Sequence, residues 1–145
     1  MQWYRIQCKV DPFTQQTNKM SQALRQKVSN WALTSFFVFA GVMHFVHPEW
    51  FLRAMPPYIP FPLEVVFISG VFEILGGVGV QVQAARKFAG YGLIALLIAV
   101  FPVNIHMALH PEVFPQFPAV ALYVRLLFQP LFILWVWSSA IRDQS

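Results

Sequence analysis

Polar side chains inside apolar segments are the residues of this sequence that could do chemistry. Glu73 lies near the middle of an apolar run, residues 63–82, that is long enough to cross a bilayer. A carboxyl group at that depth costs about 2.5 kcal/mol or more, so it must face protein or water and have a partner. Arg125, in a later apolar run, lies within about one helical turn of the same depth. We therefore expect Glu73 and Arg125 to form an ion pair.

The other apolar runs carry polar side chains at a similar height. At roughly 1.5 Å of rise per residue, His44, Asn104 and Gln129 fall in the same half of the membrane as Glu73. This convergence predicts an intramembrane polar cluster that binds a ligand, formed by His44, Ser69, Glu73, Asn104, Arg125 and Gln129. The alternative is that a buried ion pair only fixes how the helices pack, with no chemistry.

Two glycines share a helical face with Glu73, namely Gly70 and Gly77. A position without a side chain can let a neighbouring helix approach closely. It can equally leave clearance for a flat ligand beside the carboxyl group. The sequence leaves both interpretations open.

Four histidines lie in two pairs near the ends of apolar runs. His44 and His47, and likewise His106 and His110, have the spacing that could present two ligands to a metal or haem. Capping and interface roles are more common at helix ends, so we predict neither a metal nor a haem. A Pro-Glu pair follows each of the two histidine pairs, which suggests a weak internal repeat. Chance similarity of two helix exits is the alternative.

The composition is that of an integral membrane protein. Of 145 residues, 57% are hydrophobic and only 11% are charged, whereas soluble domains carry about 25% charged residues. Apolar runs over residues 31–46, 63–82, 88–109 and 119–140 predict an all-α bundle of four transmembrane helices in contact with lipid. We expect Pro102 to break the third run. The basic residues flank these runs without interleaved aromatics, so no nucleic-acid binding is predicted.

The positions of Lys and Arg predict the orientation of the chain. They are concentrated before the first run, in the turn 83–87 and at the C-terminus, while the two proline-rich loops hold only Arg53. Both termini are therefore expected to be cytoplasmic. We divide the chain into a cytoplasmic tail, residues 1–28, and a membrane domain, residues 29–141. We expect residues 1–19 to be poorly ordered and an interfacial helix to begin near Met20, which competes with Met1 as the native start.

Several motifs of self-contained enzymes are missing. Gly77-Val78-Gly79 lacks the third glycine of a dinucleotide fingerprint, and the sequence has no Walker loop. No serine or cysteine has the surroundings of an activated nucleophile. Cys8 is the single cysteine, so the chain forms no thiol pair. An accessory subunit is therefore a better interpretation than an enzyme.

The order and spacing of several motifs resemble the DoxX-like family of membrane proteins. The matching segments are Gly41-Val42-Met43-His44-Phe45, Met55-Pro56-Pro57-Tyr58-Ile59-Pro60, Ser69 to Gly77, Phe101-Pro102-Val103-Asn104, and Arg125 with Gln129. The resemblance covers about residues 21–141 and implies a four-helix transmembrane fold. It also implies recurrent polar positions at His44, Glu73, Asn104, Arg125 and Gln129. Relatives are associated with quinone-linked sulfur oxidation, oxidative-stress complexes and, in animals, chaperoning of receptor subunits.

We therefore expect a redox-associated accessory subunit of the bacterial inner membrane. Its polar site would bind a quinone-like or other small apolar ligand, and a membrane or redox protein, or a second copy of the chain, would be its partner. The alternative is an assembly factor or chaperone-like scaffold without catalytic activity. A weaker third hypothesis is a small-solute transporter, for which four helices would need to dimerise.

Overall fold

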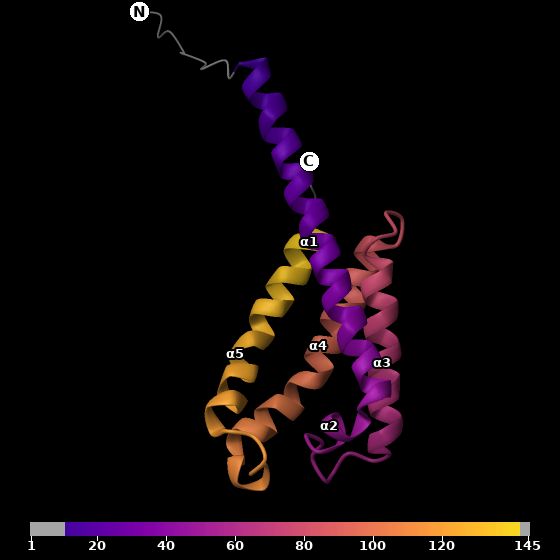
Figure 1. The fold of residues 1–145 in the computed structure, drawn as a ribbon, viewed down its shortest axis with the longest axis vertical. Coiled ribbons are helices and arrows are strands. Elements are labelled where there is room, and N and C mark those ends of the chain that lie inside the picture. Colours follow the sequence, from indigo (N-terminus) through magenta and orange to yellow (C-terminus); the bar gives the residue numbers. More distant parts are fainter. Residues whose placement is uncertain (1–10, 143–145) are drawn as a thin grey trace, which may run out of the picture.

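In the computed structural model, which describes residues 11–142, the secondary-structure elements are all helices, joined by turns and loops, and no strand is present among these residues (Figure 1). Four are long and apolar enough to cross a membrane: α1 (Pro12–Val46), α3 (Pro62–Gly79), α4 (Arg86–Leu109) and α5 (Ala119–Val136). A π-helical segment, η2 (Trp137–Ile141), continues α5. Two short helices, α2 (Pro48–Leu52) and the 3-10 helix η1 (Pro111–Val113), lie in the connections. The predicted all-α architecture with four apolar spans is confirmed.

Proline sets several of the helix boundaries. α1 ends at Val46, and Pro48 follows one residue later. Pro62 is the first residue of α3, and Pro111 begins η1. Proline disfavours helical conformation in the preceding residue but is tolerated in the first turn of a helix. Phe61, just before α3, has a left-handed backbone with φ of 51°. The chain therefore changes direction sharply as it enters this helix.

The first helix is longer than the sequence suggested. We expected residues 1–19 to be a poorly ordered tail and a boundary after residue 28, but α1 is continuous from Pro12 to Val46. Residues 13–30 include four Gln, two Lys and one each of Arg, Leu, Ala and Met, which favour helix, and contain neither Gly nor Pro. The exposed first half of α1 extends beyond the bundle (Figure 1). Residues 1–10, which include Cys8, lie outside the described residues.

The prolines inside the later helices do not break them. Pro102 lies within α4 and Pro130 lies within α5, so the expected break at Pro102 is wrong. Within a membrane bundle, neighbouring side chains can satisfy backbone groups around a proline. Close to Pro102, Gln129 Nε2 donates a hydrogen bond of 2.5 Å to the Leu97 carbonyl, which adjoins the Ile98 carbonyl left without a donor by the proline.

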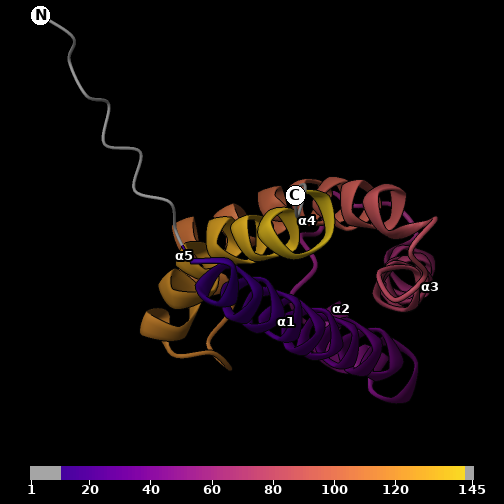
Figure 2. The same ribbon diagram turned by 90° about the horizontal axis from the view of Figure 1, so that it is seen from above.

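The packing order of the four long helices determines where the site forms. α1 packs along α3, α3 packs on α4, and α4 packs on α5 (Figures 1 and 2). α1 and α5 meet near one end only, where Trp135 Nε1 donates to Ser29 Oγ at 3.0 Å and Phe36 stacks on Phe132 with centroids 4.9 Å apart. From there the two helices diverge toward α2 (Figure 1). The space between them contains the main pocket.

Candidate functional site

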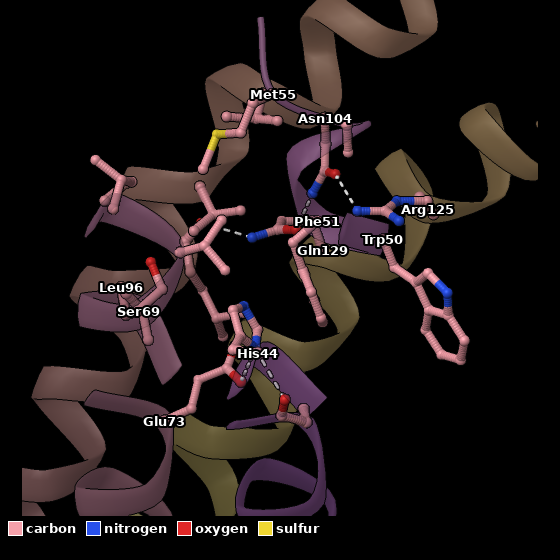
Figure 3. A pocket seen from close by; sticks show the side chains of 18 of the residues that line it. His44, Trp50, Phe51, Met55, Ser69, Glu73, Leu96, Asn104, Arg125 and Gln129 are labelled. Carbon is pink, nitrogen blue, oxygen red and sulfur yellow. Dashed lines mark hydrogen bonds and ion pairs between the residues drawn. The ribbon is translucent and has the colours of Figure 1, made fainter. Parts of the chain in front are cut away.

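The main pocket has a volume of about 970 Å³ and is lined by residues of all four long helices. Most of the lining is aliphatic or aromatic, and α2 with the loop after it closes the end. All six polar residues that the sequence singled out line this pocket (Figure 3): His44, Ser69, Glu73, Asn104, Arg125 and Gln129. The structure thus brings them together, while their binding of a ligand stays a prediction.

The first set of polar side chains in the pocket consists of a carboxyl group and an imidazole on neighbouring helices. His44 Nδ1 lies 2.8 Å from the Ala40 carbonyl and 3.5 Å from Glu73 Oε2. Because a carbonyl only accepts, Nδ1 carries the proton and donates it to Ala40. Glu73 Oε2 is therefore left buried without a hydrogen-bond partner. Native proteins rarely leave such an atom unsatisfied, so this oxygen is available to a bound molecule.

The second polar group is a chain of hydrogen bonds that joins α4 to α5. Arg125 Nη2 donates to Asn104 Oδ1 at 3.2 Å, and Asn104 Nδ2 donates to Gln129 Oε1 at 2.7 Å. Gln129 Nε2 then donates to the Leu97 carbonyl. Asn104 and Gln129 are buried, whereas Arg125 is exposed at the pocket. The chain orients the guanidinium and leaves it further N–H groups to donate.

The predicted ion pair between Glu73 and Arg125 is wrong. Glu73 lies beside His44, and Arg125 donates to Asn104 instead. The reason is the packing order, since α1 is the direct neighbour of α3 while α5 packs on α4. Equal depth in the membrane brought the two residues to one pocket, but it did not bring them into contact.

The glycines beside Glu73 serve helix packing. A Cβ atom on Gly70 would lie 2.7 Å from the His44 Cβ, and one on Gly77 would lie 3.2 Å from the Phe37 Cβ. Both glycines therefore face α1, and neither lines the pocket. Of the two interpretations left open by the sequence, the structure supports close helix approach. Ser69 lines the pocket from the same helix.

The two histidine pairs end their helices in the same way. His47 and His110 have nearly equal backbone angles, with φ of −132° and −127°, and each is followed by a proline. His47 Nδ1 lies 3.0 Å from Glu49 Oε1, and His110 Nδ1 lies 3.2 Å from Glu112 Oε1. The repeat seen in the sequence is thus a repeated local structure. In residues 11–142, no group of three or more His, Cys, Asp or Glu is placed to hold a metal ion.

The carboxyl groups of these two turns titrate at reduced pH. The pKa of Glu49 is lowered by the hydrogen bond from its own backbone N–H and then by the side chain of His47. The pKa of Glu112 is lowered by the hydrogen bond from its own backbone N–H, with a smaller contribution from His110. Both turns lie outside the four long helices, so these carboxylates face water as anions.

The sequence missed the aromatic side of the pocket. Phe51, in α2, stacks on the His44 ring with centroids 3.6 Å apart and planes 24° from parallel. Trp50 and Met55 also line the pocket (Figure 3). A signal was present, because Phe51 and Phe114 occupy similar places after the repeated His-Pro-Glu turns, and Phe114 lies against His106 with centroids 5.9 Å apart. Each turn therefore places a phenylalanine on a histidine of the preceding helix.

Comparison with known proteins gives a family and little else. Residues 33–140 match the model of a domain of unknown function (DUF8561). No curated protein and no solved structure matches the chain. The matched segment contains the last part of α1 and nearly all of α2 to η2, and so includes every residue of the pocket.

Proposed function

The chain belongs to the DUF8561 family, and we propose that its pocket binds a small, flat, apolar molecule with oxygen atoms at its edges, such as a quinone. In this proposal the protein is a redox-associated accessory subunit of a membrane, and the pocket holds the ligand without doing chemistry alone. The observation that carries the proposal is the buried Glu73 Oε2, which has no hydrogen-bond partner in a pocket of about 970 Å³. Small-molecule sites in proteins have comparable volumes.

The arrangement of polar groups supports a ligand with two polar edges. His44 and Glu73 offer a carboxyl oxygen and an imidazole on the α1 and α3 side, while Arg125 offers N–H groups on the α5 side. Between them the lining is aliphatic and aromatic (Figure 3). A flat ring with a carbonyl at each edge could accept hydrogen bonds from both sides at once, from the protonated carboxyl group of Glu73 and from the guanidinium of Arg125. Phe51, stacked on His44, adds an aromatic face against which such a ring could pack.

The divergence of α1 and α5 supports access to the pocket from the lipid. The pocket residues Phe36 and Phe128, on these two helices, are 42% and 48% exposed. Such partly exposed aromatic rings of the pocket lining would contact lipid chains in a bilayer. An apolar ligand could therefore reach the polar groups without crossing the aqueous loops.

Charge distribution supports the proposed orientation. The basic residues Arg86, Lys87 and Arg142 lie at the end of the bundle from which α1 projects, and the opposite end holds only Arg53 among the described Lys and Arg residues (Figure 1). By the positive-inside rule, both termini would lie in the cytoplasm. We propose a bacterial inner membrane as the location, and the resemblance to the DoxX-like family points the same way.

The scaffold hypothesis has lost one of its supports. It relied on an ion pair of Glu73 with Arg125 that locks the bundle, and these residues have other neighbours. The proline-rich loop still supports this hypothesis, because Trp50 and Tyr58 are 55% and 64% exposed and available to a partner. A stable partner protein in fixed stoichiometry, with an empty pocket, would favour the scaffold.

Native mass spectrometry of the protein released from membranes tests the proposal. We expect a bound small molecule, identified as a quinone by its absorbance and by lipid extraction. Glu73→Leu should lower the occupied fraction about tenfold while the helix content stays unchanged, because the hydrogen bond from the carboxyl group to the ligand is lost. Ile98→Val is the matched control, since Ile98 is exposed on α4 and does not line the pocket. Equal occupancy in Glu73→Leu and the control would contradict a ligand role for Glu73.

A further inference from the structure

The exposed side of α1 carries a regular apolar line along the whole length of the helix. Steps of four, three and four residues repeat along α1, and every position that they select is exposed: Phe13, Thr17, Met20, Leu24, Val28, Trp31, Ser35, Phe39, Val42 and Val46. Only Thr17 and Ser35 among them are polar. The steps add up to an eleven-residue repeat, and its positions fall within about 100° of arc on one face of the helix.

The apolar line is most distinct in the half of α1 that extends beyond the bundle (Figure 1). All large apolar side chains of residues 13–30 belong to the line and are more than 60% exposed, namely Phe13, Met20, Leu24 and Val28. Lipid does not explain an apolar stripe on a segment that leaves the membrane. Isolated helices of roughly 15 residues or fewer are only marginally stable in water. The line therefore indicates a surface that a partner covers.

The direction of the projecting half is fixed by contacts on the other side of α1. The Gln26 side chain donates to the Ser139 carbonyl, and Ser29 Oγ lies 2.6 Å from Ser139 Oγ. Residues 13–40 contain neither Gly nor Pro, so this part of α1 lacks the residues at which helices usually bend. The projecting half thus continues straight out of the bundle. It does not turn to lie on the membrane surface.

We propose that the apolar line binds the same line on a second copy of the chain, so that two α1 helices pack side by side. A partner that covers the whole line must cross from water into the membrane at the same level as α1. A second copy in the same membrane has the same orientation and carries the same repeat at the same height. A two-fold axis along the membrane normal then brings each position against its equivalent in a closed dimer. With 3.67 residues per turn, the two helices stay nearly straight along the contact.

The charges of α1 leave the apolar line free for a second copy. Lys19 and Arg25 lie about 90° or more around the helix from the centre of the line, so both stay in water when the line is covered. Lys27 lies at the edge of the line, where its long side chain can reach water. The line itself carries no charge, so an acidic partner has nothing to pair with there. None of its residues lines the main pocket, so the dimer is independent of the ligand.

Disulfide cross-linking of the full-length chain in isolated membranes tests this proposal. In a Cys8→Ser background, Leu24→Cys places a thiol on the apolar line, and Gln22→Cys places one at an exposed position on the opposite side. We expect oxidation with copper phenanthroline to convert most Leu24→Cys chains, and few Gln22→Cys chains, into disulfide-linked dimers. Equal yields at the two positions would mean random collision and would overturn the proposal.

Sedimentation equilibrium in detergent micelles measures the same dimer without a new thiol. Leu24→Ala with Val28→Ala should weaken the dimer at least about tenfold, because two apolar side chains leave the interface. Asn18→Ala with Gln22→Ala is the matched control, since it truncates two exposed side chains away from the line. Alanine favours helix in both double variants, and circular dichroism verifies the helix content.

We expect the wild type and the control to form dimers of equal stability. A monomeric wild type, or equal weakening in both double variants, would overturn the proposal. Co-purification of a different protein, released by Leu24→Ala with Val28→Ala, would assign the apolar line to that protein and would overturn self-association.

Discussion

Replacing Gly70 with alanine tests how closely α1 and α3 must approach each other to form the site. A Cβ atom at this position would lie 2.7 Å from the His44 Cβ and 2.9 Å from the Gly41 carbonyl oxygen. Carbon contacts are normally about 3.5–4.0 Å, so the helices would have to separate locally by roughly 1 Å. Overpacking of this kind costs about 1–3 kcal/mol. His44 would also move relative to Glu73, so the pocket would lose its shape on that side.

Gly92→Ala is the matched control for this prediction. A Cβ atom at Gly92 meets nothing within 4 Å, and Gly92 lies in a long helix as Gly70 does. The gain in helix propensity, up to about 1 kcal/mol, is common to both variants and cancels in the comparison. Gly70→Ala should therefore be less stable than Gly92→Ala by about 1–3 kcal/mol.

The assay is denaturation of the purified protein in mixed micelles with increasing SDS, followed by circular dichroism. Gly70→Ala should unfold at lower SDS than the wild type, and Gly92→Ala at the same or higher SDS. If Gly70→Ala were as stable as Gly92→Ala, the close approach of α1 to α3 would be wrong. The position of His44 beside Glu73 would then lose its physical basis.

Three further predictions concern the polar groups. In a double-mutant cycle, Asn104→Ala and Gln129→Ala should show a coupling free energy of about 0.5–1.5 kcal/mol, because they share a direct hydrogen bond; additive losses of stability would contradict the bond. Glu73→Ala and Arg125→Ala should instead be additive within about 0.5 kcal/mol, since neither contacts the other, and rescue of one loss by the second substitution would restore the rejected ion pair. The lowered pKa of Glu49 predicts stability that is fully present above its ordinary pKa of 4.5 and is lost as the pH falls through the folded-state pKa. The wild-type melting temperature should thus fall more than that of Glu49→Gln between about pH 6 and pH 3, and parallel curves would contradict it.

The fold followed from the sequence because each span was marked by its composition. Long apolar runs have few alternatives to a transmembrane helix, since unpaired backbone groups are too costly in lipid. Prolines at residues 48, 62 and 111 marked boundaries that the structure bears out. The start of α1 was missed because residues 13–19 are polar and include Thr and Asn, and this polarity was interpreted as disorder although no Gly or Pro interrupts the segment.

The sequence could predict which residues form the site, but it could not predict which of these residues contact one another. Depth along each helix follows from the rise per residue, and it correctly brought His44, Glu73 and Arg125 to one pocket. Which helices are neighbours depends on side-chain packing across the whole bundle, and depth contains no information about it. The partner of Glu73 was therefore predicted on the wrong helix.

The central claim is that the main pocket binds a quinone-like molecule, and calorimetric titration with a short-chain benzoquinone tests it most directly. Val100→Trp would fill the pocket from α4, whereas Ile98→Trp would add the same bulk on the exposed side of the same helix. We predict that the wild type and Ile98→Trp bind the quinone with equal affinity and that Val100→Trp, with its unfolding midpoint verified, binds at least about tenfold more weakly. Equal binding by all three proteins, or no binding by the wild type, would contradict the claim.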